Sequence, residues 1–355
     1  MRLGTCIALE LVCAMGACTG VWFAAGRGVD SLGDVLQPEA AAATTPAPIV
    51  TKLDPGTLIV KAKATDSTIY ELPDEQLLAP LAATPVTGVK LNHGGTSLSL
   101  RLEFASGARA AFKPQQTHPQ SDPRREIAAY RIDRMLGIGH VPPAKSAVFA
   151  TADLIAAAKT DARDYTEQRL ADEAIAHDGK VVGEVSWWIP EIRDATIGEF
   201  RVDEQGGMAQ WVPLLQAGTP VPPENQRLIE DLSNVIVFDV LIDNADRWTG
   251  NNTKCSVDHQ TLYFMDNTLS FSNFTLGHEA NLNPLHRISK FSRKLVHRLR
   301  TLTYTSVAQI SADDNLGALL EPGEIKALLA RRDHLLRYID GLTAELGEAN
   351  VLALP

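Results

Sequence analysis

Residues 238–271 read FDVLIDNADRWTGNNTKCSVDHQTLYFMDNTLSF, and this stretch carries the densest chemistry in the chain. Asp246 lies in a turn-rich run of aspartates, asparagines and glycines, and Asn251 follows five positions later. Asp266 comes directly after a short apolar segment, 262–265, that is typical of a strand. The stretch therefore sets two carboxylates and one amide at fixed spacing around a turn and a strand end.

These three side chains suit phosphoryl transfer from a nucleotide, in which the protein mainly positions the acceptor and holds divalent metal against the phosphates. Asp246 would orient the acceptor hydroxyl, while Asn251 and Asp266 offer oxygen ligands of the kind that magnesium or manganese prefers. The alternative is an ordinary turn, because aspartate and asparagine bond their own backbone and tolerate left-handed conformations. The position of Asp266 at the end of a strand favours the catalytic interpretation.

The composition is that of a folded, acidic protein. The chain has 355 residues, of which 45% are hydrophobic and 21% charged, and its formal net charge is −10. This length suits one two-lobed domain or two small domains. No basic stripe offsets the negative total, so we expect no nucleic-acid partner. Cys255 is the only cysteine after Cys18, which excludes an intramolecular disulfide framework in the folded part.

The N-terminus predicts export or anchoring. Residues 1–25 begin with Arg2 and a mostly apolar run that ends in small residues before Cys18, as in a bacterial lipoprotein signal. An uncleaved membrane anchor of about twenty residues and a buried N-terminal helix are the alternatives. Residues 26–56 are rich in alanine, threonine, proline and glycine and predict a flexible tether. We expect a membrane-tethered lipoprotein, periplasmic or on the cell surface, or a secreted protein, with membrane association only through this segment.

Periodicity predicts strands and helices from about residue 57 onward. Alternating segments flank the turn at Gly107, which is a hairpin signal. Residues 191–222 contain adjacent glycines and late prolines and predict a loop or insertion. The expected strands are 57–64, 98–104, 108–112, 145–150, 181–189 and 262–265, and the expected helices are 121–137, 152–176, 224–242 and 321–346.

A second group of polar residues lies before and after the hairpin. Gly94, Gly95 and Thr96 precede its first strand, and a glycine pair lets backbone N–H groups approach a phosphate, although a plain turn is the simpler interpretation. Lys113 ends the second strand, where its ammonium can pair with nucleotide phosphates. Glu126, near the start of the helix at 121–137, either complements the helix dipole or forms an ion pair that directs Lys113.

Four sequence blocks, in this order, resemble the secretory-pathway kinases, meaning the Golgi casein-kinase and four-jointed group. More distantly they are similar to HipA and to phosphatidylinositol-kinase-like atypical kinases. The resemblance extends from about residue 88 to 275, with little to match between 150 and 230. The blocks are GGTSLSL at 94–100, AAFKP at 110–114, EIAAYRIDRMLG with its VPP at 126–143, and DNADR with DNTLSF at 243–271.

The resemblance implies an α+β, atypical two-lobed protein-kinase-like fold, with a β-rich N-lobe at 57–190 and a mostly helical C-lobe at 191–355. It implies ATP and Mg²⁺ or Mn²⁺ as cofactors. The activity it implies is transfer of the γ-phosphoryl group to a serine or threonine hydroxyl of an exported protein. The alternatives are a glycan hydroxyl, a nucleotide-binding pseudokinase that scaffolds or activates a partner, and transfer of AMP. A cytoplasmic location would instead favour a HipA-like role on an intracellular target.

By the same resemblance, Gly94, Gly95 and Thr96 would cover the phosphates of ATP. Lys113 would contact these phosphates and pair with Glu126. The presence of that glutamate favours an active kinase over a pseudokinase.

The resemblance also assigns Asp246 as the catalytic aspartate, Asp266 as a metal ligand and Asn251 as the second metal position. Two departures concern the acceptor more than the phosphate chemistry. Trp248 stands where a smaller basic residue often follows Asp-Arg, and there it could reshape the acceptor pocket. Thr268 replaces the glycine expected after Asp-Asn.

Overall fold

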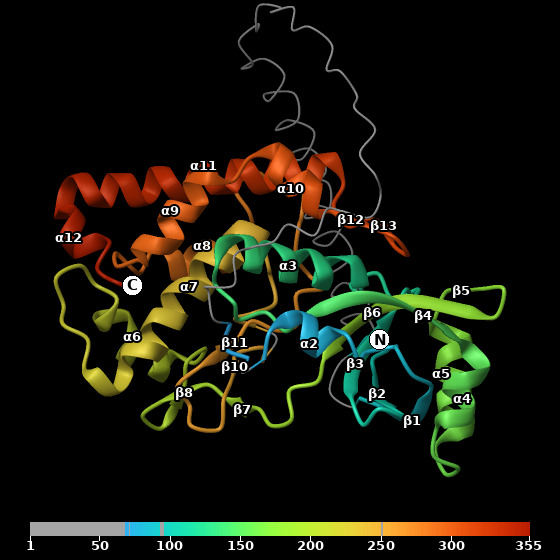
Figure 1. Cartoon of the computed structure of the whole chain (residues 1–355). Helices are drawn as coiled ribbons and strands as arrows, with labels where there is room; N and C mark the ends of the chain where they lie inside the picture. Colours follow the sequence, from blue (N-terminus) through green and yellow to red (C-terminus); the bar gives the residue numbers. More distant parts are fainter. Residues whose placement is uncertain (1–67, 71, 93–95, 250) are drawn as a thin grey trace, which may run out of the picture. The chain divides into compact units, whose positions relative to one another are not determined.

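The computed structural model describes residues 68–70, 72–92, 96–249 and 251–355 (Figure 1). The predicted signal, the tether and the strand at 57–64 lie outside these residues, as do Gly94 and Gly95. Within the described ranges, no helix combines the length and apolarity needed to cross a membrane.

A β-rich part comes first along the chain. In the described residues its main sheet has six antiparallel strands in the order β1-β2-β3-β6-β4, and β5 pairs with β6 (Figure 1). The predicted hairpin is confirmed, and its Gly107 has a φ of 85°, which glycine adopts without strain. The strands are β1 (Val86–Leu91), β2 (Leu100–Phe104), β3 (Arg109–Pro114), β4 (Ala144–Ala150), β5 (Ala176–His177) and β6 (Lys180–Trp187).

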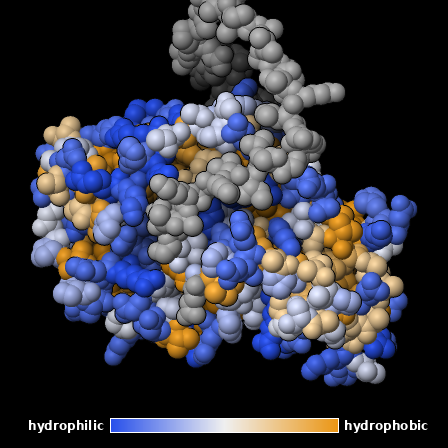
Figure 2. Space-filling view, in the orientation of Figure 1, coloured by the Kyte–Doolittle hydropathy of each residue, from blue (hydrophilic) through white to orange (hydrophobic). Residues whose placement is uncertain are grey.

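The two faces of this sheet differ in chemistry. Leu100, Leu102 and Phe112 are buried in a hydrophobic core together with Leu154 of α4 (Thr151–Ala157) and Leu170 of α5 (Arg163–Glu173). Side chains alternate along a strand, so the polar residues between the apolar ones face the other side. That second face packs against α3 (Pro123–Leu136), and Lys113 points from it toward this helix. Figure 2 shows apolar atoms gathered over the sheet end of the molecule and a mainly hydrophilic surface elsewhere in that view.

The helical part is built around α7 (Gln226–Ile242). All but one of its residues from Leu228 to Ile242 are buried, because other elements surround it. Its core also contains apolar residues of α3, so that helix packs with the helical part as well as with the sheet. The remaining elements are α2 (Asp74–Leu78), α6 (Gln205–Leu214), η1 (Pro223–Asn225), α8 (Glu279–Leu285), α9 (Arg293–Thr301), α10 (Tyr304–Ile310), α11 (Pro322–Leu346), α12 (Glu348–Val351), β7 (Arg193–Asp194), β8 (Thr196–Ile197), β9 (Phe200–Arg201), β10 (Lys254–Cys255), β11 (Leu262–Tyr263), β12 (Ala312–Asp313) and β13 (Gly317–Ala318).

Two predicted segments are wrong. The helix expected at 152–176 is interrupted between α4 and α5, where Ala158 adopts extended backbone and bridges to Val89 of β1. For the loop or insertion expected at 191–222, the loop alternative is wrong, because the segment contains short strands and α6. The adjacent glycines suit close packing here, because a Cβ on Gly207 would lie 2.0 Å from the Arg201 carbonyl oxygen. The indole N–H of Trp211 donates to Val202 O at 2.8 Å, which ties α6 to the segment before it.

A close approach of β3 and β6 makes Gly183 necessary. A Cβ there would lie 2.3 Å from Lys113 O and 2.6 Å from Pro114 Cα, both of which are backbone atoms. The pairing of these two strands therefore fixes the position of the Lys113 backbone, from which the side chain extends.

We predict that Gly183→Ala lowers the free energy of unfolding by about 2 kcal/mol or more, because the added methyl group forces β3 and β6 apart. The matched control is Gly341→Ala in α11, where a Cβ meets nothing within 4 Å. The control should be neutral or stabilise the protein by up to about 1 kcal/mol, since alanine favours helix over glycine. Chemical denaturation of both variants measures the difference, and equal stability for the two would contradict the packing argument.

Candidate active site

Three charged side chains from separate segments meet beside the sheet. Lys113 Nζ at the end of β3 lies 2.6 Å from Glu126 Oε1 on α3 and 2.8 Å from Asp266 Oδ1, which follows β11. Burial lowers the pKa of Lys113, but the two carboxylates outweigh this effect, so the net shift is upward. The ammonium of Lys113 lowers the pKa of Asp266 in turn. Lys113 and Asp266 therefore each favour the charged form of the other.

Glu126 also connects α3 to the segment that follows Asp266. Its Oε2 accepts hydrogen bonds from the backbone N–H of Asn267 at 3.0 Å and from Asn267 Nδ2 at 3.3 Å. Asp266 has a φ of 60°, a left-handed conformation that is uncommon outside glycine. Such conformations persist where surrounding contacts impose them, and they concentrate at functional sites.

Asn244 brings the Asp246 loop to Asp266. Its Oδ1 accepts from the Asp246 N–H at 3.2 Å, and its Nδ2 donates to Asp266 O at 3.1 Å. A second amide, Asn252 Nδ2, donates to Asp246 Oδ2 at 2.8 Å. Burial and the nearby Asp266 raise the pKa of Asp246. The two aspartates of the sequence motif therefore lie close enough to interact.

A buried arginine fixes this loop from behind. Arg247 is 1% exposed, and its Nε lies 3.2 Å from Asp239 Oδ2 on α7. The same guanidinium donates to Asn252 O at 3.2 Å, to Asn267 Oδ1 at 2.9 Å and to Met265 O. It thereby joins the central helix, the Asp246 loop and the Asp266 segment.

The donor set fits a divalent ion that is shared with phosphate oxygens. Among the described residues, no three histidine, cysteine, aspartate or glutamate side chains form a self-sufficient metal cage. Asp266 offers a carboxylate and Asn251 an amide oxygen, which matches the few protein ligands that Mg²⁺ takes at nucleotide sites. Asn251 is exposed with a φ of 62°, and its Oδ1 lies 3.5 Å from Lys254 Nζ. The neighbouring Asn252 is the amide that contacts Asp246.

Other predicted positions have different outcomes. Thr96 is exposed in a bend, and Gly94 and Gly95 lie outside the described residues, so the phosphate-covering role stays a prediction. Trp248 packs against Trp211 of α6 with ring centroids 6.0 Å apart and joins the helical core. Its ring thus contributes to packing, and its effect on the acceptor pocket stays a prediction.

Sequence reasoning missed Glu184. It pairs with Lys113 across β3 and β6, is 1% exposed, and its Oε1 has no hydrogen-bond partner among the described residues. Burial and the nearby Glu126 raise the pKa of Glu184 to about 8. The only signal in the sequence was an acidic residue within the apolar strand at 181–189. A single acid in a strand is as common on an exposed surface as in a functional site, so it did not identify Glu184.

The raised pKa predicts a pH dependence of stability. The Glu184 carboxyl titrates near 4.5 when unfolded and near 8 when folded, so its contribution to stability falls as the pH rises through that window. Glu184→Gln should remove this trend and gain on the order of 2 kcal/mol relative to wild type between pH 5 and pH 8. Glu167→Gln, on the exposed face of α5, is the control. Parallel stability curves for Glu184→Gln and wild type would contradict the shift.

Comparisons with known proteins identify relatives in sequence and in fold. The family model described as "Golgi casein kinase, C-terminal, Fam20" matches residues 217–351. A glycosaminoglycan xylosylkinase of Danio rerio is 25% identical over 315 residues, covering 78% of this chain and 76% of the relative. The human extracellular serine/threonine protein kinase FAM20C is 22% identical over 323 residues, covering 78% of this chain and 55% of its own length.

Solved structures show the same fold. A crystal structure of the Golgi casein kinase superposes with a TM-score of 0.62 at 17% identity, covering 80% of this chain and 79% of that one. The Golgi casein kinase with Mn/ADP bound gives a TM-score of 0.60 at 17% identity, covering 79% and 78% of the two chains. The α+β architecture and the resemblance drawn from the four sequence blocks are confirmed, and the chain is a distant member of the Fam20, or Golgi casein kinase, family of ATP-dependent kinases.

Proposed function

We propose that this protein transfers the γ-phosphoryl group of ATP to a serine or threonine hydroxyl of an exported protein. The observation that supports it is the ion-paired trio of Lys113, Glu126 and Asp266 next to Asp246. These residues come from β3, α3 and two loops that are far apart in the sequence. Phosphoryl transfer needs this combination of a cation, metal-binding oxygens and an acceptor-orienting carboxylate.

Lys113 would neutralise the phosphates as a compact charge. Glu126 holds its ammonium at 2.6 Å, so the side chain is already oriented before the nucleotide arrives. Mg²⁺ or Mn²⁺, with Asp266 as its ligand, would supply stabilisation of the charge on the phosphate oxygens. Asn251 remains our proposal for a second ligand, and Asn252 is the nearer alternative because it already contacts Asp246.

Asp246 would accept the hydrogen bond of the acceptor hydroxyl. Asn252 occupies Oδ2 at 2.8 Å, and no described residue hydrogen-bonds to Oδ1, which is therefore the atom available to an acceptor. The upward pKa shift strengthens this carboxylate as a base, because a more basic group accepts a proton more readily.

A glycan hydroxyl is the second candidate acceptor. The match to this chain covers 76% of the glycosaminoglycan xylosylkinase but only 55% of the protein kinase FAM20C. A structure of hydra Fam20 with sugar also superposes, with a TM-score of 0.61 at 17% identity and 80% and 93% of the two chains covered. We rank the protein acceptor first on the resemblance of the motifs.

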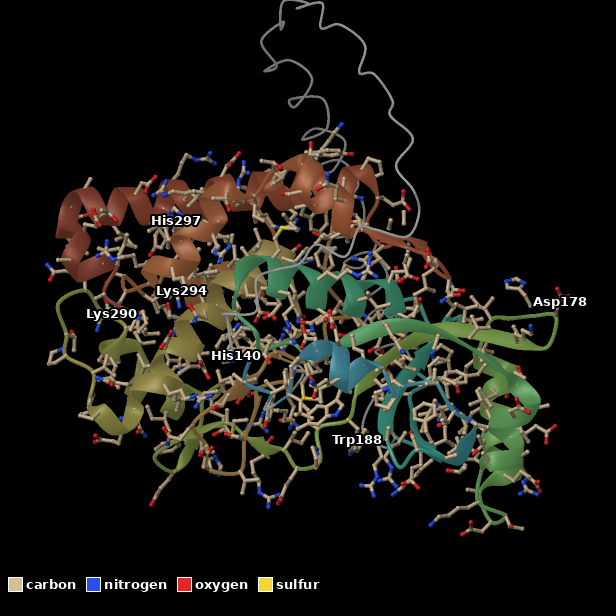
Figure 3. The ribbon with its side chains drawn as sticks, in the orientation of Figure 1. His140, Asp178, Trp188, Lys290, Lys294 and His297 are labelled. Carbon is tan, nitrogen blue, oxygen red and sulfur yellow. The ribbon has the colours of Figure 1, made fainter. Side chains whose placement is uncertain are left out.

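Residues 286–300, HRISKFSRKLVHRLR, form a basic run that is either a solvated helix face or a contact for an acidic acceptor. Only its second half forms α9, whose Lys294 and His297 lie on the helical part in Figure 3. Arg293 and Arg300 already pair with Glu348 and Asp340. A solvated helix face is therefore the better interpretation.

We also propose the export and lobe assignments. The relatives are named for the Golgi and the extracellular space, which supports export through residues 1–25 and a tether at 26–56. A boundary near residue 190 is supported by the separate hydrophobic cores of the sheet and of the helical part. The exceptions are α3 and, after it, Val141 and Ala144, which precede the boundary and contribute to the helical core.

Two substitutions test the catalytic roles. Asp246→Ala should lower turnover at least a hundredfold while leaving nucleotide affinity nearly unchanged, since the acceptor loses its orienting group. Asp266→Ala should weaken Mn²⁺-dependent ADP binding at least tenfold, because a charged ligand is lost. Asp172→Ala on the exposed face of α5 is the control for both. Near-normal turnover by Asp246→Ala would remove the catalytic assignment.

Acceptor and reaction are separated by one set of assays. The purified protein is incubated with ATP and Mn²⁺ and either a protein mixture or a xylose-containing glycan, and products are weighed by intact mass. A phosphate-sized gain on protein supports our first proposal, and a gain on the glycan supports the second. A gain of AMP indicates a nucleotidyl transferase. Thermal stabilisation by the nucleotide without any transfer indicates a pseudokinase.

A further inference from the structure

Helix α3 carries Glu126 in its first turn, and arginines on the same helix contact residues 310–324, near the other end of the chain. In Figure 1, α3 lies beside α10 and the β12–β13 hairpin. Because Glu126 must meet Lys113, the position of α3 decides whether the candidate active site is assembled.

The first contact joins the start of α3 to the start of α11. Arg125 Nη2 donates to Glu324 Oε1 at 3.0 Å. The other oxygen of Glu324, Oε2, accepts from the Glu321 N–H at 2.8 Å and caps α11. Glu324 is 7% exposed, so its carboxylate needs both partners. One side chain thus holds two helix ends together.

The second contact joins the middle of α3 to the β12–β13 hairpin. Arg131 Nη2 lies 3.0 Å from Asp313 Oδ2, and its Nη1 donates to Ile310 O at 2.8 Å and Ala312 O at 2.5 Å. Asp313 Oδ1 accepts from the backbone N–H of Leu316 at 3.1 Å, which holds the hairpin turn. This carboxylate also bridges α3 and its own backbone.

The two arginines bracket Glu126 along the helix. Arg125 precedes Glu126 and Arg131 follows it, so the two arginines are six positions apart, which spans about 9 Å at 1.5 Å per residue. Anchors at two heights and on more than one side of a helix restrict both its translation and its rotation. Ion pairs that also satisfy backbone groups on a neighbouring element lose several hydrogen bonds at once if the helix shifts.

We propose that residues 310–324 are a positioning element for phosphotransfer, in which Glu324 and Asp313 hold α3 where Glu126 pairs with Lys113. The inference rests on the proposed function, because it assigns these contacts a role in that same site. It implies that the Lys113–Glu126 pair forms without a partner protein or a covalent modification to move α3. Arg125, Arg131, Asp313 and Glu324 are then positioning residues that do not touch the substrate.

The test combines each contact with Glu126. The variants are Arg125→Gln, Glu324→Gln and Asp313→Asn, each alone and together with Glu126→Gln. Glu324→Gln keeps an oxygen to cap α11, so it serves where Arg125→Gln fails to fold. Arg300→Gln breaks the exposed pair with Asp340, which involves no residue of α3, and is the control. The readouts are kcat/KM, the dissociation constant of Mn·ADP and hydrogen exchange in residues 123–136.

We expect each single variant to lower kcat/KM at least tenfold and to speed hydrogen exchange in α3, while Arg300→Gln changes neither. In the Glu126→Gln background the same variants should lower kcat/KM little further. Glutamine at position 126 cannot form the ion pair with Lys113, so the position of α3 no longer affects that pair. Wild-type kinetics in the single variants, or losses that multiply with that of Glu126→Gln, would overturn the positioning role. If the wild type binds Mn·ADP but never transfers phosphate, the proposed function fails. The dissociation constants of Mn·ADP and the hydrogen-exchange rates of α3 in the variants then still decide the positioning role.

Discussion

The buried guanidinium of Arg247 is the constraint on which the arrangement of the site depends. An arginine that is 1% exposed is stable only when its charge and its donors are satisfied. Asp239 of α7 supplies the opposite charge, and the remaining donors reach the Asp246 loop and the Asp266 segment. The separation of the two aspartates is therefore set by one side chain anchored in the core of the helical part.

From this anchor the network extends to the sheet. Asn267 accepts from Arg247 and donates to Glu126, and Glu126 in turn holds Lys113. Each step uses a charged or backbone group, so the loss of one member leaves a buried partner unsatisfied. The contacts of α3 with residues 310–324 support this chain from the outside. The site is a continuous hydrogen-bonded path from α7 to β3 rather than a set of independent residues.

Much of this was predictable from sequence because it depends on local patterns. Apolar periodicity identified α3 and α7, and position at the end of an expected strand singled out Lys113 and Asp266. The glycine pair of α6 misled the prediction, because close packing and turn formation require the same residue. Glu184 and Asn252 were missed since a single polar residue carries no periodicity. Arg125 and Glu324 are 199 positions apart, and neither periodicity nor a local motif in a single sequence indicates a contact over that separation.

The central claim is that Asp266 and Asp246 face one bound nucleotide and its ion beside Lys113. Crystals grown with Mn²⁺ and a non-hydrolysable ATP analogue test it directly through the anomalous signal of manganese. The account predicts a manganese peak bonded to a carboxylate oxygen of Asp266, with the terminal phosphate between that ion and Asp246. A nucleotide bound elsewhere on the molecule, or an ion without Asp266 among its ligands, would contradict it.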